Sequence, residues 1–221
     1  MKKDLISVTD PGVAGAAQLI EEALVMKQGG MRCLLPWRSV ALLFEKPSLR
    51  TRVSFDLAVT QLGGHCLYLS PQEVGLGQRE PVPDVARVLS RYVDCIVARV
   101  FEHSTLVSLA ESASVAVVNA LSDHEHPCQA LADFLTIRER KGGLSGVRLA
   151  YVGDGNNVAR SLALLSGMLG VTFRIASPAG YELDGESVAQ ARSLAAACGT
   201  AIELLRDPVE AVTGADVVYT D

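Results

Sequence analysis

The sequence predicts an α/β protein with two doubly wound parallel-sheet domains, the second of them incomplete. Two observations lead to this prediction. Short apolar runs, typical of buried parallel strands, alternate with longer helical segments along nearly the whole chain. A glycine-rich break at residues 141–146 (KGGLSG) interrupts the alternation, and a new apolar strand follows it directly. We therefore expect one domain over residues 1–140 and a second over residues 147–221.

The first domain is expected to begin with a helix. Thr9 or Asp10 precedes Pro11, a favoured residue at the first helical position, and apolar residues recur at helical spacing until Gly29 and Gly30 end the segment. An apolar strand follows at residues 39–44 (SVALLF). Further helices are predicted at 48–62, 84–92, 104–112 and 127–140, and further strands at 66–69, 95–100 and 115–119.

The second domain repeats the alternation. Strands are predicted at 147–152, 172–176, 201–205 and 215–220, with helices at 158–169, 185–197 and 208–213 between them. Strands separated by helices of this length imply parallel units with right-handed crossovers. This domain is expected to be incomplete, because it ends on a strand with no following helix to cover the far side of its sheet.

Composition narrows the class of protein. The 221 residues are 49% hydrophobic, which is enough to bury a sizeable core in a soluble globular protein. Twenty basic and 25 acidic residues give a net charge of −5, and no block of Lys and Arg is dense enough to follow a nucleic-acid backbone. No segment has the length of a membrane span. Neither nucleic acid nor a membrane is expected as a partner.

The cysteines favour a reducing, cytoplasmic compartment. They are odd in number, have no CxxC spacing, and three lie in apolar segments where thiols behave as small hydrophobic groups. No apolar core follows the charged N-terminal Met1-Lys2-Lys3-Asp4, so neither an export nor an import signal is expected. The five cysteines are Cys33, Cys66, Cys95, Cys128 and Cys198.

The strand at 39–44 is followed by residues suited to phosphate. Ser48, Arg50 and Thr51 open the helix after it, and the amide N–H groups at a helix N-terminus have no partners within the helix. These groups also carry the positive end of the helix dipole, so an anion gains hydrogen bonds and a favourable field there. The sequence therefore predicts a phosphate cradle and a small phosphorylated substrate.

Three other strand ends present polar groups, and parallel sheets bind ligands at these ends. Arg99 ends one strand, residues 126–129 (HPCQ) follow another after Asp123, and residues 154–157 (DGNN) follow a third. Taken singly, the polar residues at all four strand ends have simpler interpretations. Ser48 could be only a helix cap, Arg99 half of an ion pair, and His126 a turn residue. Their convergence on one edge favours a ligand site.

Several other kinds of site do not fit the spacing. Residues 153–158 (GDGNNV) follow a strand like a dinucleotide fingerprint but lack its third glycine, which makes a dehydrogenase a distant alternative. Neither a nucleotide P-loop nor a GxSxG hydrolase elbow is present. His124 and His126 are not four residues apart, so they do not share a helix face for a metal. No metal and no cofactor are expected.

These segments resemble the aspartate/ornithine carbamoyltransferase family, and within it the ornithine-specific branch. The similarity lies in residues 44–55 (FEKPSLRTRVSF), 119–133 (NALSDHEHPCQALAD) and 153–157 (GDGNN), and it extends through 84–92 and 215–221. The resemblance implies an enzyme that transfers the carbamoyl group of carbamoyl phosphate to the δ-amine of L-ornithine, giving L-citrulline and phosphate in arginine metabolism. It also implies a homotrimer or a multiple of trimers.

The resemblance also implies a role for each site residue. Ser48, Leu49, Arg50 and Thr51 hold the phosphate, partly through backbone N–H groups, and Arg99, His126 and Gln129 surround the carbamoyl group. Thr51, Arg99 and His126 are the catalytic residues, because they polarise the carbonyl oxygen. Asn157, with Asn156, holds the amino-acid end of ornithine, and Asp221 holds its reacting side.

Two departures from the family pattern are visible. In the loop at residues 73–80 (EVGLGQRE), Gly75 stands where a Gln is usual and the basic residue comes one position late, as Arg79. That loop would serve a neighbouring subunit. The segments that usually follow Asp221, including part of the ornithine site, are not in the sequence. Alternatives are therefore a carbamoyltransferase for putrescine or N-acetylornithine, or a truncated binding module with impaired turnover.

Overall fold

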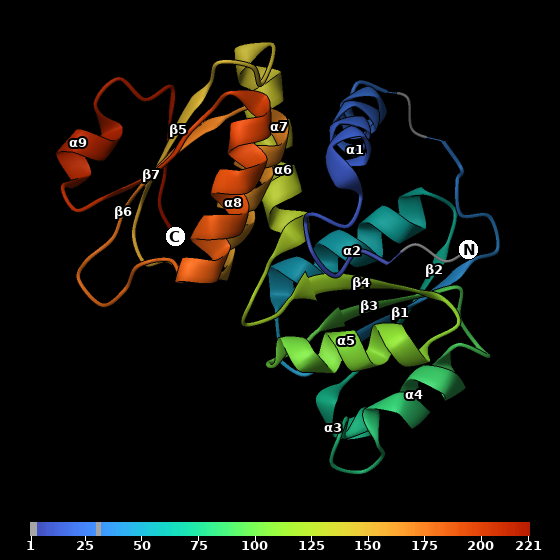
Figure 1. Ribbon diagram of the computed structural model, residues 1–221. Helices are drawn as coiled ribbons and strands as arrows, with labels where there is room; N and C mark the ends of the chain where they lie inside the picture. Colours follow the sequence, from blue (N-terminus) through green and yellow to red (C-terminus); the bar gives the residue numbers. More distant parts are fainter. Residues whose placement is uncertain (1–3, 30–31) are drawn as a thin grey trace. The chain divides into compact units, whose positions relative to one another are not determined.

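The computed structural model describes residues 4–29 and 32–221, so Gly30 of the predicted helix stop and the first three residues of the N-terminal segment lie outside the described residues. It contains two parallel four-stranded sheets flanked by helices, which confirms the predicted α/β class (Figure 1). No helix within these described ranges is long and apolar enough to cross a membrane.

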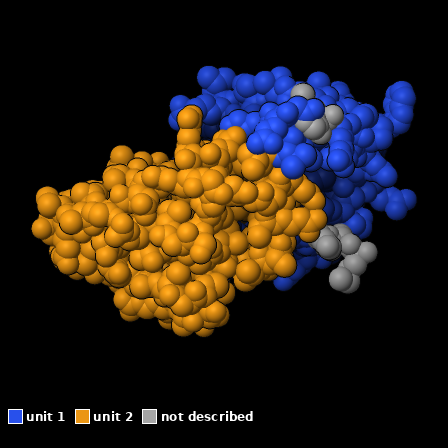
Figure 2. Space-filling model, turned by 90° about the horizontal axis from the view of Figure 1, so that it is seen from above, with its two compact units in different colours: residues 1–10, 25–124 blue, residues 11–24, 125–221 orange. Residues whose placement is uncertain are grey.

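Contact density divides the chain into two compact units (Figure 2). The first consists of residues 1–10 and 25–124, and the second of residues 11–24 and 125–221. The predicted helix at 127–140 therefore groups with the second sheet, together with most of the first helix. The domain boundary expected between residues 140 and 147 stays a prediction.

The sheet of the first unit has the strand order β2-β1-β3-β4, all parallel. Helix α2 lies on one face and helices α4 and α5 lie on the other (Figure 1). Its strands are β1 (Ser39–Phe44), β2 (His65–Leu69), β3 (Cys95–Arg99) and β4 (Ala116–Leu121), and its helices are α2 (Leu49–Gln61), α3 (Pro71–Val74), α4 (Val82–Leu89) and α5 (His103–Ser112).

Alternation along β1 distributes its side chains between two cores. Ala41 and Leu43 pack with Leu106 and Leu109 of α5, and the neighbouring residues of β1 pack with Val59 of α2. Successive side chains of a strand point to opposite faces, so a strand that is apolar throughout must be covered on both sides. The continuous run SVALLF therefore specifies a sheet with helices on both faces.

The sheet of the second unit has the order β7-β6-β5-β8, again all parallel. Helices α7 and α8 cover one face, and the short helix α9 contacts β5 and β6 on the other, so that face is partly covered (Figure 1). The strands are β5 (Arg148–Val152), β6 (Thr172–Ala176), β7 (Ile202–Leu205) and β8 (Val217–Tyr219), and the helices are α6 (Pro127–Lys141), α7 (Asn157–Leu169), α8 (Gly185–Cys198) and α9 (Pro208–Val212).

Helix α7 is the centre of the second unit, since all residues from Val158 to Met168 are buried. Both α6 and α8 pack against it. The first helix of the chain, α1 (Gly12–Lys27), is tied to α6 by an ion pair between Glu21 Oε1 and Arg138 Nε at 2.6 Å. This pair explains why most of α1 groups with residues that follow it by more than a hundred positions.

Several elements differ from the sequence-based prediction, most by one or two residues at an end. Helix α3 was not predicted, although Ser70 and Glu73 form a capping box at its start. Helix α4 begins at Val82 rather than at residue 84, because Pro83 is tolerated in the first helical turn. Strand β8 is shorter than predicted, since Asp216 accepts a hydrogen bond from the Arg148 amide at 2.9 Å through its side chain.

The loop after β5 is held against residues 181–183. The amide of Gly155 donates to the carbonyl of Tyr181 at 2.6 Å, and a Cβ at Gly155 would lie 2.1 Å from the amide N of Leu183. No side chain fits at that distance, because the obstructing atoms belong to backbone. The lack of a side chain at Gly155 thus permits the close contact between the loop before α7 and residues 181–183.

We expect Gly155→Ala to lower the free energy of unfolding by about 1–3 kcal/mol, because the added methyl forces the two backbone segments apart. Gly143→Ala is the matched control, since a Cβ there meets no atom within 4 Å. That control should change stability by less than about 0.5 kcal/mol. Urea unfolding followed by circular dichroism measures both, and equal stabilities of the two variants would contradict the role assigned to Gly155.

Candidate active site

The predicted site residues lie at the carboxyl ends of the strands, at the points where the chain changes direction across each sheet. In the first sheet the chain runs from β1 outward to β2 and from β3 to β4 on the other side. In the second it runs from β5 toward β6, and β8 lies on the opposite side of β5. Ligands of open α/β sheets bind at such switch points.

Ser48 is the N-cap of α2, with extended backbone dihedral angles and a side-chain oxygen that accepts from the Thr51 amide at 3.4 Å. Its hydroxyl also donates to Thr51 Oγ1 at 2.9 Å. The cap holds the first turn of α2 in place directly after β1. The remaining amides of this turn are left for a ligand, which is the arrangement that binds anions.

Arg99 is the last residue of β3, beside Phe44 in the sheet register. The β3–β4 ladder is irregular at this position: Ala98 pairs with Asn119 and Arg99 with Leu121, so Ala120 is an extra residue on β4. Bulges of this kind re-aim side chains at the rim of a sheet. Arg99 Nη1 donates to Thr51 Oγ1 at 3.2 Å and thereby joins the end of β3 to the start of α2.

The charge of Arg99 has no counterion in the described part of the chain. Burial lowers the pKa of its guanidinium, and its Nε is buried without a hydrogen-bond acceptor among the described residues. The first turn of α2 also contains no acidic residue, and Arg50 is exposed in that turn. A partly desolvated cation beside a helix N-terminus favours a bound anion.

Arg52 takes a different role from its neighbours. Its guanidinium carbon lies 3.8 Å from the centre of the Tyr68 ring, a cation–π contact between α2 and β2. This contact packs the Arg52 side chain of α2 against the Tyr68 side chain of β2. Arg52 therefore acts in packing, while Ser48, Thr51 and Arg99 form one hydrogen-bonded chain.

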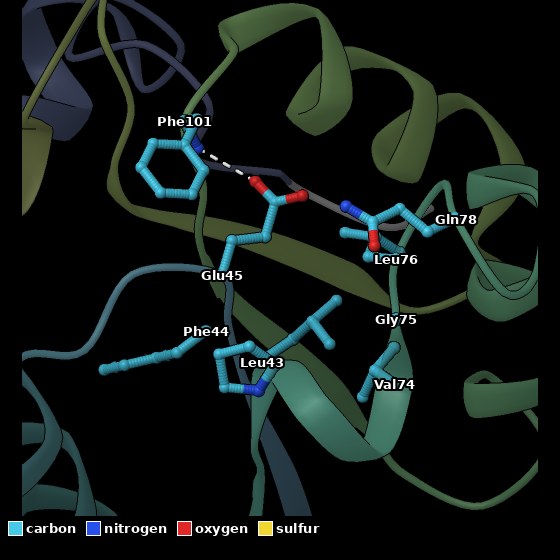
Figure 3. Close-up of a pocket in the computed structure, with 9 residues that line it drawn as sticks. Leu43, Phe44, Glu45, Val74, Gly75, Leu76, Gln78 and Phe101 are labelled. Atoms are coloured by element: carbon cyan, nitrogen blue, oxygen red, sulfur yellow. Dashed lines mark hydrogen bonds between the residues drawn. The ribbon is translucent and has the colours of Figure 1, made fainter.

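The first unit also contains a pocket of about 170 Å³, and its lining does not include Ser48, Thr51 or Arg99 (Figure 3). Its lining is largely apolar, from the end of β1, α3 and the loop after it. The polar side chains of the lining are Gln78 and Glu45, and the Glu45 carboxylate accepts a hydrogen bond from the Phe101 amide at 2.9 Å. Because a carboxylate repels phosphate, this pocket is not suited to be the anion site. The lining residues are Leu43, Phe44, Glu45, Pro71, Val74, Gly75, Leu76, Gln78 and Phe101.

The loop after α3 is folded on itself. Gly75 has a left-handed backbone (φ 55°) and caps α3, and the carbonyl of Gly75 accepts from the Arg79 amide at 2.7 Å. Arg79 Nη1 donates to the carbonyl of Glu73 at 3.3 Å. The basic residue of this loop is thus held by its own loop within this chain.

In the second unit, His126 is the N-cap of α6 and Gln129 lies one turn further along. The His126 amide donates to Ser161 Oγ of α7 at 3.0 Å, which fixes the start of α6. Gln129 Nε2 donates to Asp133 Oδ1 at 2.9 Å. Both side chains are half-buried.

Asn156 caps α7 and holds the end of β8 at the same time. Its Oδ1 accepts from the amides of Val158 and Ala159, each at 3.0 Å, and its Nδ2 donates to Asp221 Oδ2 at 3.1 Å. Asn157 is the first residue of α7. Two predicted site residues, Asn156 and Asp221, are thus brought into direct contact across the β5–β8 switch point.

Three residues near these groups were not predicted as site residues: Asp133, Tyr151 and Tyr219. Burial raises the pKa of Asp133 to about 6, opposed by hydrogen bonds from Gln129 and from the Tyr219 hydroxyl. Burial and then Asp221 raise the pKa of Tyr151 to about 12, and burial also raises that of Tyr219. The spacing of Gln129 and Asp133, four residues apart on a predicted helix, was the available signal.

The cysteines divide into two groups. Burial raises the pKa of Cys66 and Cys95 to about 11 and that of Cys128 to about 12, whereas Cys33 and Cys198 are exposed. None of the five, all of which lie in the described part of the chain, forms a disulfide bond. No cluster of three or more His, Cys, Asp or Glu side chains suited to a metal occurs over residues 4–29 and 32–221.

Comparison with known proteins identifies the family of this chain. The family model for the aspartate/ornithine carbamoyltransferase carbamoyl-P binding domain matches residues 3–139, and that for the Asp/Orn binding domain matches residues 145–221. The anabolic ornithine carbamoyltransferase of Pyrococcus furiosus is 48% identical, over 99% of this chain and 71% of its own length. The catabolic ornithine carbamoyltransferase of Thermoplasma acidophilum is 45% identical, over 100% of this chain and 72% of its own.

The solved structure of ornithine carbamoyltransferase from Pyrococcus furiosus has a TM-score of 0.95 to this chain, at 48% sequence identity, and the match covers 99% of this chain and 71% of that one. The chain thus spans about 70% of the length of these relatives. Two family models that together cover nearly all of it, and relatives of this identity, lead to one conclusion: the chain belongs to the aspartate/ornithine carbamoyltransferase family.

Proposed function

We propose that the chain binds carbamoyl phosphate and L-ornithine and transfers the carbamoyl group to the δ-amine of ornithine, producing L-citrulline and phosphate. The observation that supports it best is the series of hydrogen bonds that joins Ser48, Thr51 and Arg99. This series sets a partly desolvated guanidinium beside the N-terminus of α2. Membership of the carbamoyltransferase family gives the substrate class.

In this proposal the phosphate of carbamoyl phosphate is held by Ser48, Leu49, Arg50 and Thr51, through their amides and through the Arg50 side chain. Neither Ser48 nor Leu49 carries charge, so their contribution is hydrogen bonding at the helix terminus. Arg50 and Arg99 supply the positive charge, and a guanidinium can bind two phosphate oxygens at once. The same groups stabilise the phosphate as it leaves.

The carbamoyl group is held by Arg99, His126 and Gln129. The neutral δ-amine of ornithine attacks the carbonyl carbon, and negative charge grows on the carbonyl oxygen. Thr51, Arg99 and His126 donate to that oxygen, and one such donor is typically worth about 3–4 kcal/mol in the transition state. The tetrahedral intermediate then collapses: the bond from carbon to the phosphate oxygen breaks, and the proton of the amine nitrogen passes to the departing phosphate.

The amino-acid end of ornithine is assigned to Asn157 with Asn156, and its reacting side to Asp221. The bond between Asn156 and Asp221 supports this assignment, because it holds both groups at one switch point. Holding two substrates in line contributes to the rate by effective molarity, roughly 7–11 kcal/mol in well-oriented reactions. No covalent intermediate with the protein is required.

We expect Arg99→Met to weaken binding of phosphonoacetamide, the stable methylene analogue of carbamoyl phosphate, about 10–100-fold. A hydrogen bond to a charged group contributes about 1.5–3 kcal/mol, which corresponds to this range. Arg87→Met is the matched control, because Arg87 is an exposed arginine of the same unit that pairs with Asp84 at 2.8 Å. Isothermal titration calorimetry measures the affinities, and an equal loss in both variants would exclude Arg99 from the anion site.

The acceptor is tested by carbamoylation assays with ornithine, putrescine and N-acetylornithine. We expect ornithine to be preferred at least about tenfold over putrescine, since putrescine lacks the α-carboxylate, which belongs to the amino-acid end assigned to Asn157 and its neighbours. The products are resolved by mass spectrometry. Faster carbamoylation of putrescine or N-acetylornithine would replace the proposed acceptor but not the proposed donor.

We also propose that the chain assembles as a homotrimer or a multiple of trimers, with α2 in the contact. Leu49, Val53 and Leu57 form one stripe on α2 and are 79%, 45% and 53% exposed. An apolar stripe of this kind is typical of an interaction surface. The cysteines of the described residues form no disulfide bond, which supports the proposal of a cytoplasmic location.

We expect Leu57→Glu to shift the sedimentation of the chain from trimer toward monomer, because the new carboxylate would be buried in the contact. Val88→Glu is the control, since Val88 is similarly exposed (52%) but lies on α4. Sedimentation velocity over a range of concentrations measures the change. A wild-type chain that sediments as a monomer at every concentration would refute the assembly proposal.

A further inference from the structure

Gln129 and Asp133 form an amide–carboxylate pair on α6, four residues apart. Gln129 Nε2 donates to Asp133 Oδ1 at 2.9 Å. An ionised carboxylate only accepts hydrogen bonds, whereas a glutamine amide has one end that donates and one that accepts. Asp133 therefore selects one of the two orientations of the Gln129 amide, and the carbonyl end, Oε1, is turned away from Asp133.

Asp133 is held from a second side. The Tyr219 hydroxyl of β8 hydrogen-bonds to it, and the Tyr219 ring stacks on Tyr151 of β5, with ring centres 5.7 Å apart and planes 14° apart. Tyr219 and Tyr151 are partners in the sheet register. The position of the Asp133 carboxylate is thus defined by a helix and by two paired strands. Through its hydrogen bond to Asp133, the Gln129 amide is held in place as well.

The surroundings of Asp133 disfavour its ionised form. Burial raises its pKa to about 6, and Asp221 acts in the same direction. Its second oxygen, Oδ2, is buried without a hydrogen-bond partner among the described residues. The groups that act on it are Gln129, Tyr219 and Asp221, with Tyr151 behind Tyr219, and none of them is a cation. A perturbed carboxyl in such a place is typical of functional sites.

We propose that Asp133 is a positioning residue for carbamoyl recognition: by holding Nε2 of Gln129, it presents Oε1 of Gln129 as the acceptor for the N–H groups of the carbamoyl donor. The inference rests on the proposed function, in which Gln129 contacts the carbamoyl group. It assigns to Asp133 the discrimination between a carbamoyl phosphate and an acyl phosphate, since an acyl group of the same shape has a methyl where carbamoyl has an NH2.

The test compares two probes that differ only in that group. Phosphonoacetamide carries the NH2, and 2-oxopropylphosphonate carries a methyl in its place. Inorganic phosphate is the third probe, because it requires only the phosphate cradle of the first unit. The affinities of all three are measured by isothermal titration calorimetry at pH 8 for the wild-type chain, Asp133→Leu and Asp133→Asn.

Glu22→Leu is the matched control. Gln18 Nε2 donates to Glu22 Oε1 at 2.7 Å on α1, which is the same pair at the same spacing in a residue range assigned to no ligand. We expect the wild-type chain and Glu22→Leu to prefer phosphonoacetamide over 2-oxopropylphosphonate by at least about tenfold. In Asp133→Leu the preference should fall to within about twofold, while the affinity for inorganic phosphate stays unchanged.

Stability separates positioning from a purely structural role. The folded-state pKa of Asp133 lies above its unfolded value, so ionisation destabilises the fold, and this penalty grows as the pH rises from about 4 to 6. Asp133→Asn cannot ionise, so its melting temperature at pH 8 should equal or exceed that of the wild-type chain. A structural role would instead lower the melting temperature together with the preference.

The pH dependence gives a second reading if Asp133→Leu does not fold. In the wild-type chain the preference for phosphonoacetamide should decline as the pH falls through about 6. A protonated Asp133 can also donate a hydrogen bond, so it no longer selects one orientation of the Gln129 amide. Asp133→Asn should have a smaller preference at pH 8 and no such decline. An Asp133→Asn chain with the wild-type preference and pH profile would overturn the inference.

The proposed function fails in a different way. If the wild-type chain binds inorganic phosphate but does not prefer phosphonoacetamide over 2-oxopropylphosphonate, carbamoyl recognition itself is refuted, and the role of Asp133 with it. If the wild-type chain has the preference and Asp133→Leu retains it, only the role of Asp133 is refuted.

Discussion

The parallel pairing of the strands is the constraint on which the rest of the structure depends. Because the strands of each sheet are parallel, the helices that follow them, such as α2 after β1 and α7 after β5, begin at the carboxyl edge of the sheet. Where successive connections run in opposite directions, the strand ends separate and leave room for a ligand. Chain topology therefore places Ser48 and Asn156, the caps of these two helices, at the edges where open α/β sheets bind ligands.

The two units have the same architecture but present different chemical groups at the ends of their strands. The strand ends of the first unit present cations and helix amides, which suit an anion that must later depart. Those of the second unit present amides, phenols and carboxylates that hydrogen-bond to one another. Such a network fixes the direction of each donor and acceptor, at the cost of keeping acidic groups partly buried. The first unit thus presents charge at its strand ends, and the second presents directed hydrogen bonds.

Much of this was predictable from the sequence because the signals are local. Apolar runs of five or six residues identify the buried strands. The polar groups directly after them indicate Ser48, Arg99 and Asn156 as site residues, which stays a prediction. The link between Asp133 and Tyr219 was not predictable, because these residues lie 86 positions apart and meet only through the pairing of β8 with β5. Helix α3 is an intermediate case: its capping box is visible in the sequence, but four residues give no periodicity.

The difference in exposure among the thiols has a practical consequence. Cys33 in the first unit and Cys198 in the second are exposed. Cys66, Cys95 and Cys128 are half-buried, and burial raises their pKa, which disfavours the reactive thiolate. Without any substitution, maleimide dyes would therefore attach preferentially at one thiol in each unit. Energy transfer between such dyes would report whether the distance between the two units changes when a ligand binds.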